Sequence, residues 1–86
     1  MKSLFFIEVT DCYGGEANYS WVTRHVIRAK SARGAIGALA RRSGIHWKND
    51  GYRYLSTSGA TCAFVDDYDT DSHGDYRLDT DDRGAK

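Results

Sequence analysis

The 86-residue sequence has no proline, only two cysteines and no net charge. Its N-terminal stretch MKSLFFIEVTD has an apolar run of about six residues, too few for a signal peptide or a membrane-spanning segment. We therefore expect one small, soluble, cytoplasmic domain. Cys12 and Cys62 do not have the spacing of a metal site. In a reducing cytoplasm two free thiols are expected, and a disulfide between them stays open.

Motifs that carry catalysis are also missing. The three histidines, His25, His46 and His73, have no partner at a diagnostic spacing. No Ser–His–Asp order, glycine-rich phosphate loop or zinc pattern occurs in the sequence. The sequence therefore predicts a protein that is not an enzyme and has no catalytic residues, metal or cofactor.

The clearest element is a helix between Ser31 and Gly44. Apolar residues recur at helical spacing, Ser31 suits the N-cap, and Gly44 suits the left-handed position after the last turn. The apolar face is narrow and mostly alanine, so the helix must pack against a flat partner, for which a β-sheet is expected. We expect Ile36 and Leu39 to anchor the helix on that sheet.

Strands are predicted on both sides of this helix. The pattern places strands at residues 3–11, 19–29 and 60–66, the first two forming a long hairpin, and strand pieces at 45–48 and 52–55 around the turn Asn49-Asp50-Gly51. The expected fold class is α+β: an antiparallel β-sheet with one helix packed on a face, in the order strand, strand, helix, strand, strand. A single domain is placed at residues 1–66. Residues 67–86 are expected to be an acidic C-terminal extension, disordered or loosely held.

Charge is unevenly distributed along the chain. Residues 1–65 carry nine Lys or Arg against four Asp or Glu, whereas residues 66–86 carry three against eight. This acidic surface could imitate the phosphates of a nucleic acid, bind a basic protein groove or simply be solvated. The repeats DTDSHG and DTDDRG partly match a calcium loop, so a calcium-binding module is a weaker alternative. The candidate acidic residues are Asp66, Asp67, Asp69, Asp71, Asp75, Asp79, Asp81 and Asp82.

The basic middle of the chain favours a different interpretation, a small nucleic-acid-binding accessory or regulatory protein. Its cations could contact phosphates, and Trp47, Tyr52 and Tyr54 could stack on bases. The alternative nucleic-acid-binding residues are Arg24, Arg28, Lys30, Arg33, Arg41, Arg42, Lys48 and Arg53.

The turn region Asp11–Trp21 combines two glycines, the carboxylate of Glu16 and three aromatic residues. It predicts a protruding hairpin whose aromatic side chains serve as interface anchors. Strand alternation places Tyr19 and Trp21 on the same face. The candidate partner-binding residues of this hairpin are Tyr13, Glu16, Tyr19 and Trp21.

The strand-to-helix stretch VIRAKSARGAIGALARRSG, with GEANYSWV before it, resembles small phage and prophage proteins, among them anti-CRISPR inhibitors of bacterial defence. The resemblance covers residues 3–65 and lies in the layout of the chain, so no functional residue is carried over. It implies a non-catalytic phage protein in the cytoplasm of an infected bacterial host. Such a protein binds and inhibits a defence protein or nucleoprotein complex, in some cases as an acidic DNA mimic. No membrane partner is expected.

Overall fold

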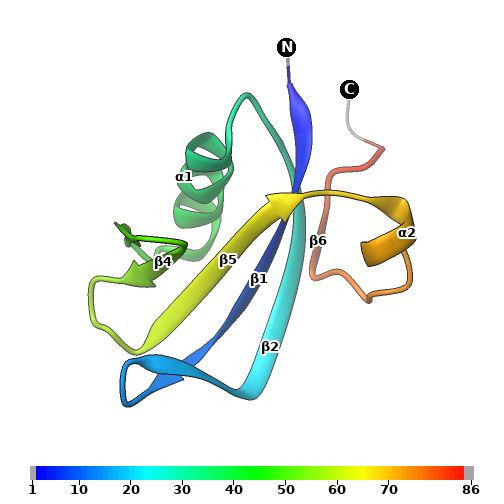
Figure 1. Cartoon of the computed structure of the whole chain (residues 1–86). Coiled ribbons are helices and arrows are strands. Elements are labelled where there is room, and N and C mark those ends of the chain that lie inside the picture. The colour runs from blue at the N-terminus through cyan, green and yellow to red at the C-terminus, as the bar shows by residue number, and fades with distance from the viewer. Residues whose placement is uncertain (1, 85–86) are drawn as a thin grey trace.

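Six strands form one sheet in residues 2–84, which a computed structural model describes (Figure 1). The elements are β1 (Ser3–Tyr13), β2 (Glu16–Ala29), α1 (Ala32–Ser43), β3 (Trp47–Asp50), β4 (Arg53–Ser56), β5 (Thr61–Asp67), α2 (Thr70–His73) and β6 (Thr80–Asp81). The strands lie in the order β3-β4-β5-β1-β2-β6. β6 runs parallel to β2, whereas the other neighbouring pairs are antiparallel. The α+β class is confirmed, but the sheet is mixed and not purely antiparallel. The predicted order is also incomplete, because β3 and β4 are separate strands and α2 and β6 follow β5.

The helix α1 lies across one face of the sheet and begins and ends where the sequence predicts. The hydroxyl of Ser31 accepts the N–H of Gly34 at 3.0 Å, and Gly44 follows the last turn with φ of 76°. Ile36 and Leu39 are only 5 % and 3 % exposed, which confirms them as anchors. The core between helix and sheet consists of Phe5, Ile7, Val9, Ile27, Ala29, Ala35, Ile36, Leu39 and Ala63.

The opposite face of the sheet is partly covered by the segment after β5. Because side chains alternate along β1, Phe6 points away from α1, and it is nevertheless only 6 % exposed. Its ring stacks on His73 with centroids 4.1 Å apart and on Tyr76 with centroids 5.7 Å apart. Arg24 lies over the ring of Tyr76, with its guanidinium carbon 4.3 Å from the ring centroid. Up to residue 84, the acidic C-terminal segment is therefore packed on the sheet, where the sequence predicts a loose extension.

β6 is attached to β2 by backbone and side-chain contacts. The backbone N–H of Asp79 donates to the carbonyl of Arg24 at 2.7 Å. The imidazole of His25 lies between the strands, with Nδ1 2.9 Å from the hydroxyl of Thr80 and Nε2 2.9 Å from that of Thr23. These two hydroxyls fix the ring of His25 where the C-terminal segment joins the sheet.

We expect the free energy of unfolding to decrease as the pH falls from about 7 to about 5, because of His25. Burial lowers the pKa of His25, and the nearby Asp79 only partly opposes this effect. In the unfolded chain the pKa returns to about 6.5. The unfolded state therefore binds the proton first, and the stabilising contribution of neutral His25 is lost with acidification. Urea unfolding at several pH values measures this slope. His25→Gln should flatten the slope and His46→Gln should leave it unchanged; equal slopes in His25→Gln and wild type would contradict the assignment.

Candidate protein-binding surface

A bulge in β2 shapes one end of the sheet. The regular pairing of β1 and β2 is interrupted at Asp11, which lies opposite residues 18–21. Its carboxylate accepts the backbone N–H of Ser20 at 2.9 Å, the hydroxyl of Ser20 at 2.5 Å and the side-chain amide of Asn18 at 2.9 Å. The hydrogen bond from the Ser20 hydroxyl is the main reason that the pKa of Asp11 lies far below its usual range. Asp11 thus holds a bulge in which Tyr19 has the left-handed backbone conformation, with φ of 57°.

Tyr19, Tyr52 and Phe64 form an aromatic patch on the face opposite α1. Phe64 pairs with Glu8 across β5 and β1, so it shares that face with Phe6. The rings of Tyr52 and Phe64 stack with centroids 6.1 Å apart. Burial and, next, the charge of Glu8, which shares the face of Phe64, raise the pKa of Tyr19. Tyr52 is 82 % exposed and Tyr19 is 53 % exposed, so the aromatic patch is open to a partner.

The bulge separates the residues predicted to act together in the hairpin. Trp21 lies on the α1 side, where it lines an apolar hollow of about 280 Å³ with Leu39 and Trp47. The predicted common face of Tyr19 and Trp21 is therefore wrong, because residues inserted at the bulge break the alternation of the strand. Tyr13 and Glu16 are exposed at the turn of the hairpin.

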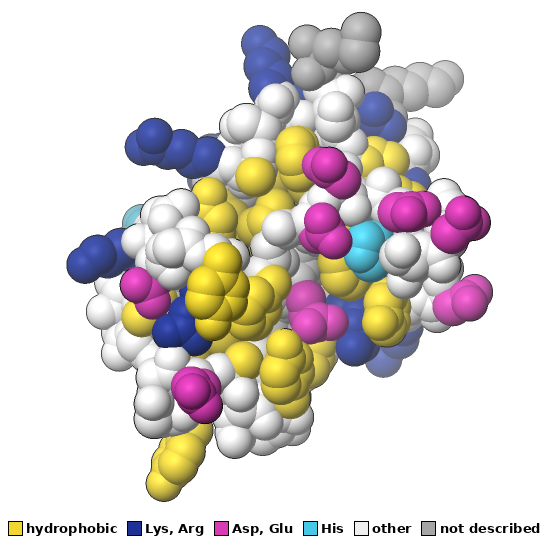
Figure 2. All heavy atoms as spheres, viewed as in Figure 1, with side chains coloured by type: hydrophobic (Ala, Val, Ile, Leu, Met, Phe, Trp, Pro, Cys, Tyr) yellow, Lys and Arg dark blue, Asp and Glu magenta, His cyan; other side chains and the backbone are white. Residues whose placement is uncertain are grey.

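The exposed carboxylates at the end of β5 and in and around α2 form an acidic patch that consists of Asp66, Asp67, Asp69, Asp71 and Asp75. Figure 2 shows acidic side chains gathered around a histidine on one side of this face, with hydrophobic side chains on the other. Among the basic side chains of residues 2–84, the imidazole of His73 is the group that lies within 4.0 Å of these carboxylates, 3.8 Å from Asp66. Asp69 also caps α2 by accepting the N–H of Asp71 at 2.9 Å. The acidic patch and the aromatic patch thus share one face of the molecule.

The remaining three predicted acidic residues stabilise the C-terminal segment. Asp79 accepts the backbone N–H of Arg24 at 3.0 Å, Asp81 pairs with Arg83 at 2.6 Å, and Asp82 pairs with Arg42 at 2.9 Å. The hydrogen bonds from Arg83 lower the pKa of Asp81 to about 2. Because these three carboxylates already have partners within the chain, they are not counted as part of the acidic patch.

The predicted nucleic-acid-binding cations are divided between the two sides of the sheet. Three form ion pairs: Arg24 with Glu8 at 3.2 Å, Arg42 with Asp82 at 2.9 Å and Arg53 with Asp50 at 3.3 Å. Arg28 donates to the carbonyl of Arg83 at 3.5 Å. Exposed positions on or next to α1 and β3 hold Lys30, Arg33, Arg41 and Lys48. The eight cations therefore do not form one continuous surface.

Both cysteines are free thiols on neighbouring strands, with Cys12 on β1 and Cys62 on β5. Burial raises the pKa of Cys62 to about 11, so this thiol is protonated at neutral pH. Within residues 2–84, no three His, Cys, Asp or Glu side chains are grouped as metal ligands. In the segment that partly matches a calcium loop, the carboxylate of Asp69 accepts the backbone N–H of Asp71 at the start of α2.

Sequence reasoning identified Tyr19 and the acidic residues, but it did not place them on one face with Tyr52 and Phe64.

No family model matches the chain, and no curated protein or solved structure shows significant similarity to it. None of the helices in the described part of the chain is long and apolar enough to cross a membrane. The candidate surface is therefore defined by geometry and charge alone.

Proposed function

We propose that this chain is a non-catalytic binding protein that docks its aromatic and acidic patches on a basic surface of a partner protein. The observation that carries the proposal is that the acidic patch lies beside exposed aromatic rings. No Lys or Arg of residues 2–84 forms an ion pair with its carboxylates. In line with the resemblance of its layout to anti-CRISPR inhibitors, the partner class is a bacterial defence protein or nucleoprotein complex. The acidic patch would occupy the groove in which that partner holds nucleic acid.

The two patches make different contributions to such a complex. The carboxylates repel one another in the free protein, and a groove lined by Arg and Lys relieves that repulsion. Their field reaches about 10 Å at 0.1 M salt, which accelerates encounter with a basic partner. Exposed tyrosines lose little side-chain entropy on binding and are favoured as interface anchors. The acidic patch therefore governs association, and the aromatic patch governs how long the complex lasts.

Replacing Asp67, Asp71 and Asp75 with asparagine should slow association with the partner and weaken the dependence of association on salt. These side chains are exposed, so the fold is expected to be unchanged. The wild-type protein, immobilised, first captures its partner from a bacterial lysate treated with nuclease, and surface plasmon resonance at several salt concentrations then measures the rates with the purified partner.

The matched control replaces the same three residues with glutamate, which keeps the charge and should keep the association rate. Equal rates and salt dependence in wild type and the asparagine variant would show that the acidic patch serves only solubility. Capture that disappears after nuclease treatment would also overturn the proposal, because the partner would then be held through nucleic acid.

A further inference from the structure

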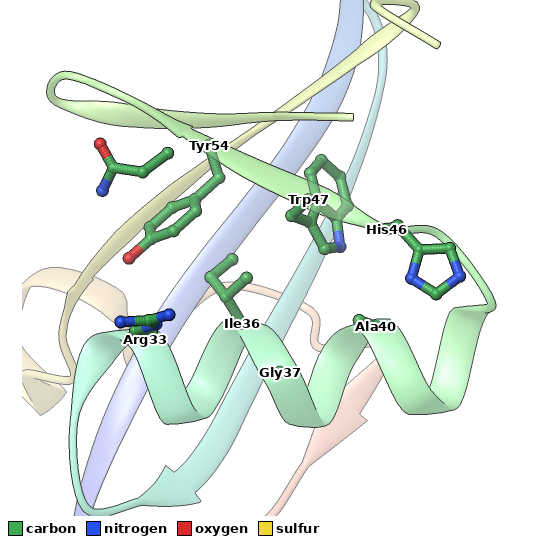
Figure 3. A pocket seen from close by; sticks show the side chains of 8 residues that line it. Arg33, Ile36, Gly37, Ala40, His46, Trp47 and Tyr54 are labelled. Carbon is green, nitrogen blue, oxygen red and sulfur yellow. The ribbon is translucent and has the colours of Figure 1, made fainter. Parts of the chain in front are cut away.

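A second surface, on the α1 side of the sheet, has a different chemistry. A groove of about 500 Å³ runs between α1 and the β3–β4 hairpin (Figure 3). This volume lies within the range of small-molecule sites. The groove walls include Arg33 and Gly37 from α1 and His46, Trp47, Asn49 and Tyr54 from the hairpin side.

One end of the groove presents hydrogen-bond donors. Arg33 is exposed, and no Asp or Glu of residues 2–84 lies within ion-pair distance of it or lines the groove. Figure 3 shows the hydroxyl of Tyr54 directed toward the helix at Arg33. The side-chain amide of Asn49 lines the same groove. A guanidinium and a phenol directed toward it can both donate to the oxygens of one anionic group, for which the guanidinium provides the charge.

The other end of the groove is a slot suited to a flat ring. Small residues, Gly37 and Ala40, face the groove from the helix, and Trp47 and His46 lie across from them (Figure 3). A side chain at Gly37 would meet the guanidinium of Arg41 at 3.5 Å, so a second cation stands beside the slot. The indole N–H of Trp47 is buried without an acceptor among the described residues, and its ring edge faces α1. An aromatic ring with hydrogen-bonding edges would suit this slot.

We propose that this groove binds a nucleotide unit, with its phosphate at Arg33 and its base between Trp47 and the helix at Gly37. Ala40 lies seven residue steps after Arg33 along the helix, about 10 Å, a length over which a phosphate and a base can reach both ends. The same unit can come from a free mononucleotide or from a single-stranded nucleic acid. The groove lies on the α1 side, away from the acidic and aromatic patches, so this inference does not depend on the proposed function.

Titration of the ¹⁵N-labelled protein with AMP, adenosine, inorganic phosphate or a short single-stranded oligodeoxyadenylate tests the proposal by NMR. AMP should shift the Trp47 indole N–H and the Gly37 amide and should bind more tightly than adenosine or phosphate alone. Arg33→Ala should weaken AMP binding about tenfold or more, because it removes charge-assisted hydrogen bonds. The matched control Lys30→Ala removes an exposed cation outside the groove lining and should leave the affinity unchanged.

The oligonucleotide distinguishes the two sources of the nucleotide unit. Tighter binding of the oligonucleotide than of AMP, at the same resonances, identifies single-stranded nucleic acid as the ligand, whereas equal or weaker binding identifies a free nucleotide. The proposal is overturned if neither AMP nor the oligonucleotide shifts the Trp47 indole resonance at ligand concentrations up to about 10 mM, which is well above a millimolar dissociation constant. It is equally overturned if Arg33→Ala binds AMP as the wild type does.

Discussion

Replacing Leu39 with alanine should lower the free energy of unfolding by about 2–4 kcal/mol. Leu39 and Ile36 are the two large, nearly inaccessible side chains that α1 contributes to the core, and Leu39 is the more buried. The rest of the helix face is mostly alanine, so Ile36 alone remains as a large apolar contact of α1 once Leu39 is truncated. Such a loss is a large fraction of the stability of a domain of this size. Urea unfolding followed by circular dichroism measures it.

Arg41→Ala provides a control on the same helix. Arg41 is exposed, and its truncation should change the free energy of unfolding by no more than about 0.5 kcal/mol. A loss at Leu39 no larger than the loss at Arg41 would mean that α1 is not held on the sheet by this contact.

Replacing Phe6 with alanine should cost about 3–5 kcal/mol and also release the C-terminal segment. Phe6 belongs to β1, but it contacts His73 and Tyr76 and not α1. Its loss removes the apolar surface on which the segment after β5 packs. Urea unfolding gives the change in stability. Hydrogen exchange should show faster exchange at the amide of Asp79, which donates to β2 in the intact protein.

Phe64→Ala is the corresponding control for this experiment. Phe64 lies on the same face of the sheet, but it is only partly buried and stacks on the exposed Tyr52. Its truncation should cost less and leave exchange at Asp79 unchanged. Unaltered exchange at Asp79 in Phe6→Ala would show that β6 holds the C-terminal segment without Phe6.

Local sequence signals were sufficient for α1 and for the five strands before α2. The cap at Ser31, the glycine at position 44 and the helical spacing of Ile36 and Leu39 act within a few residues of one another. The alternation of side chains along β1 likewise placed Phe5 and Ile7 on one face of the strand and Phe6 on the other. Interactions of this kind depend only on nearby residues, and the sequence therefore predicts them well.

The packing of the C-terminal segment could not be read in the same way. α2 has four residues and β6 has two, so neither shows a periodic pattern. What orders them is contact with Phe6 and His25, which come from distant parts of the sequence. Acidic composition alone favours disorder, and here these few tertiary contacts outweigh it.

The candidate surface was also only partly predictable. The acidic residues are visible in the composition, but the neighbours of Tyr19 depend on strand register and on the bulge at Asp11. One local signal was present: Asp11, Asn18 and Ser20 are residues whose short polar side chains bond to nearby backbone groups and interrupt regular pairing. Tyr52 and Phe64 join Tyr19 only after β4 and β5 are placed in the sheet.

The attachment of residues 79–82 to β2 also bears on self-association. β2 is the longest strand, and without this segment its outer backbone groups would be free to pair with a strand from another molecule. Asp79 accepts the N–H of Arg24 and Asp82 accepts that of Arg28, so carboxylates occupy donors that an added strand would need. Their negative charges would also repel the same segment of a second copy. The C-terminal segment thereby covers the part of the β2 edge where a strand from another molecule could otherwise pair.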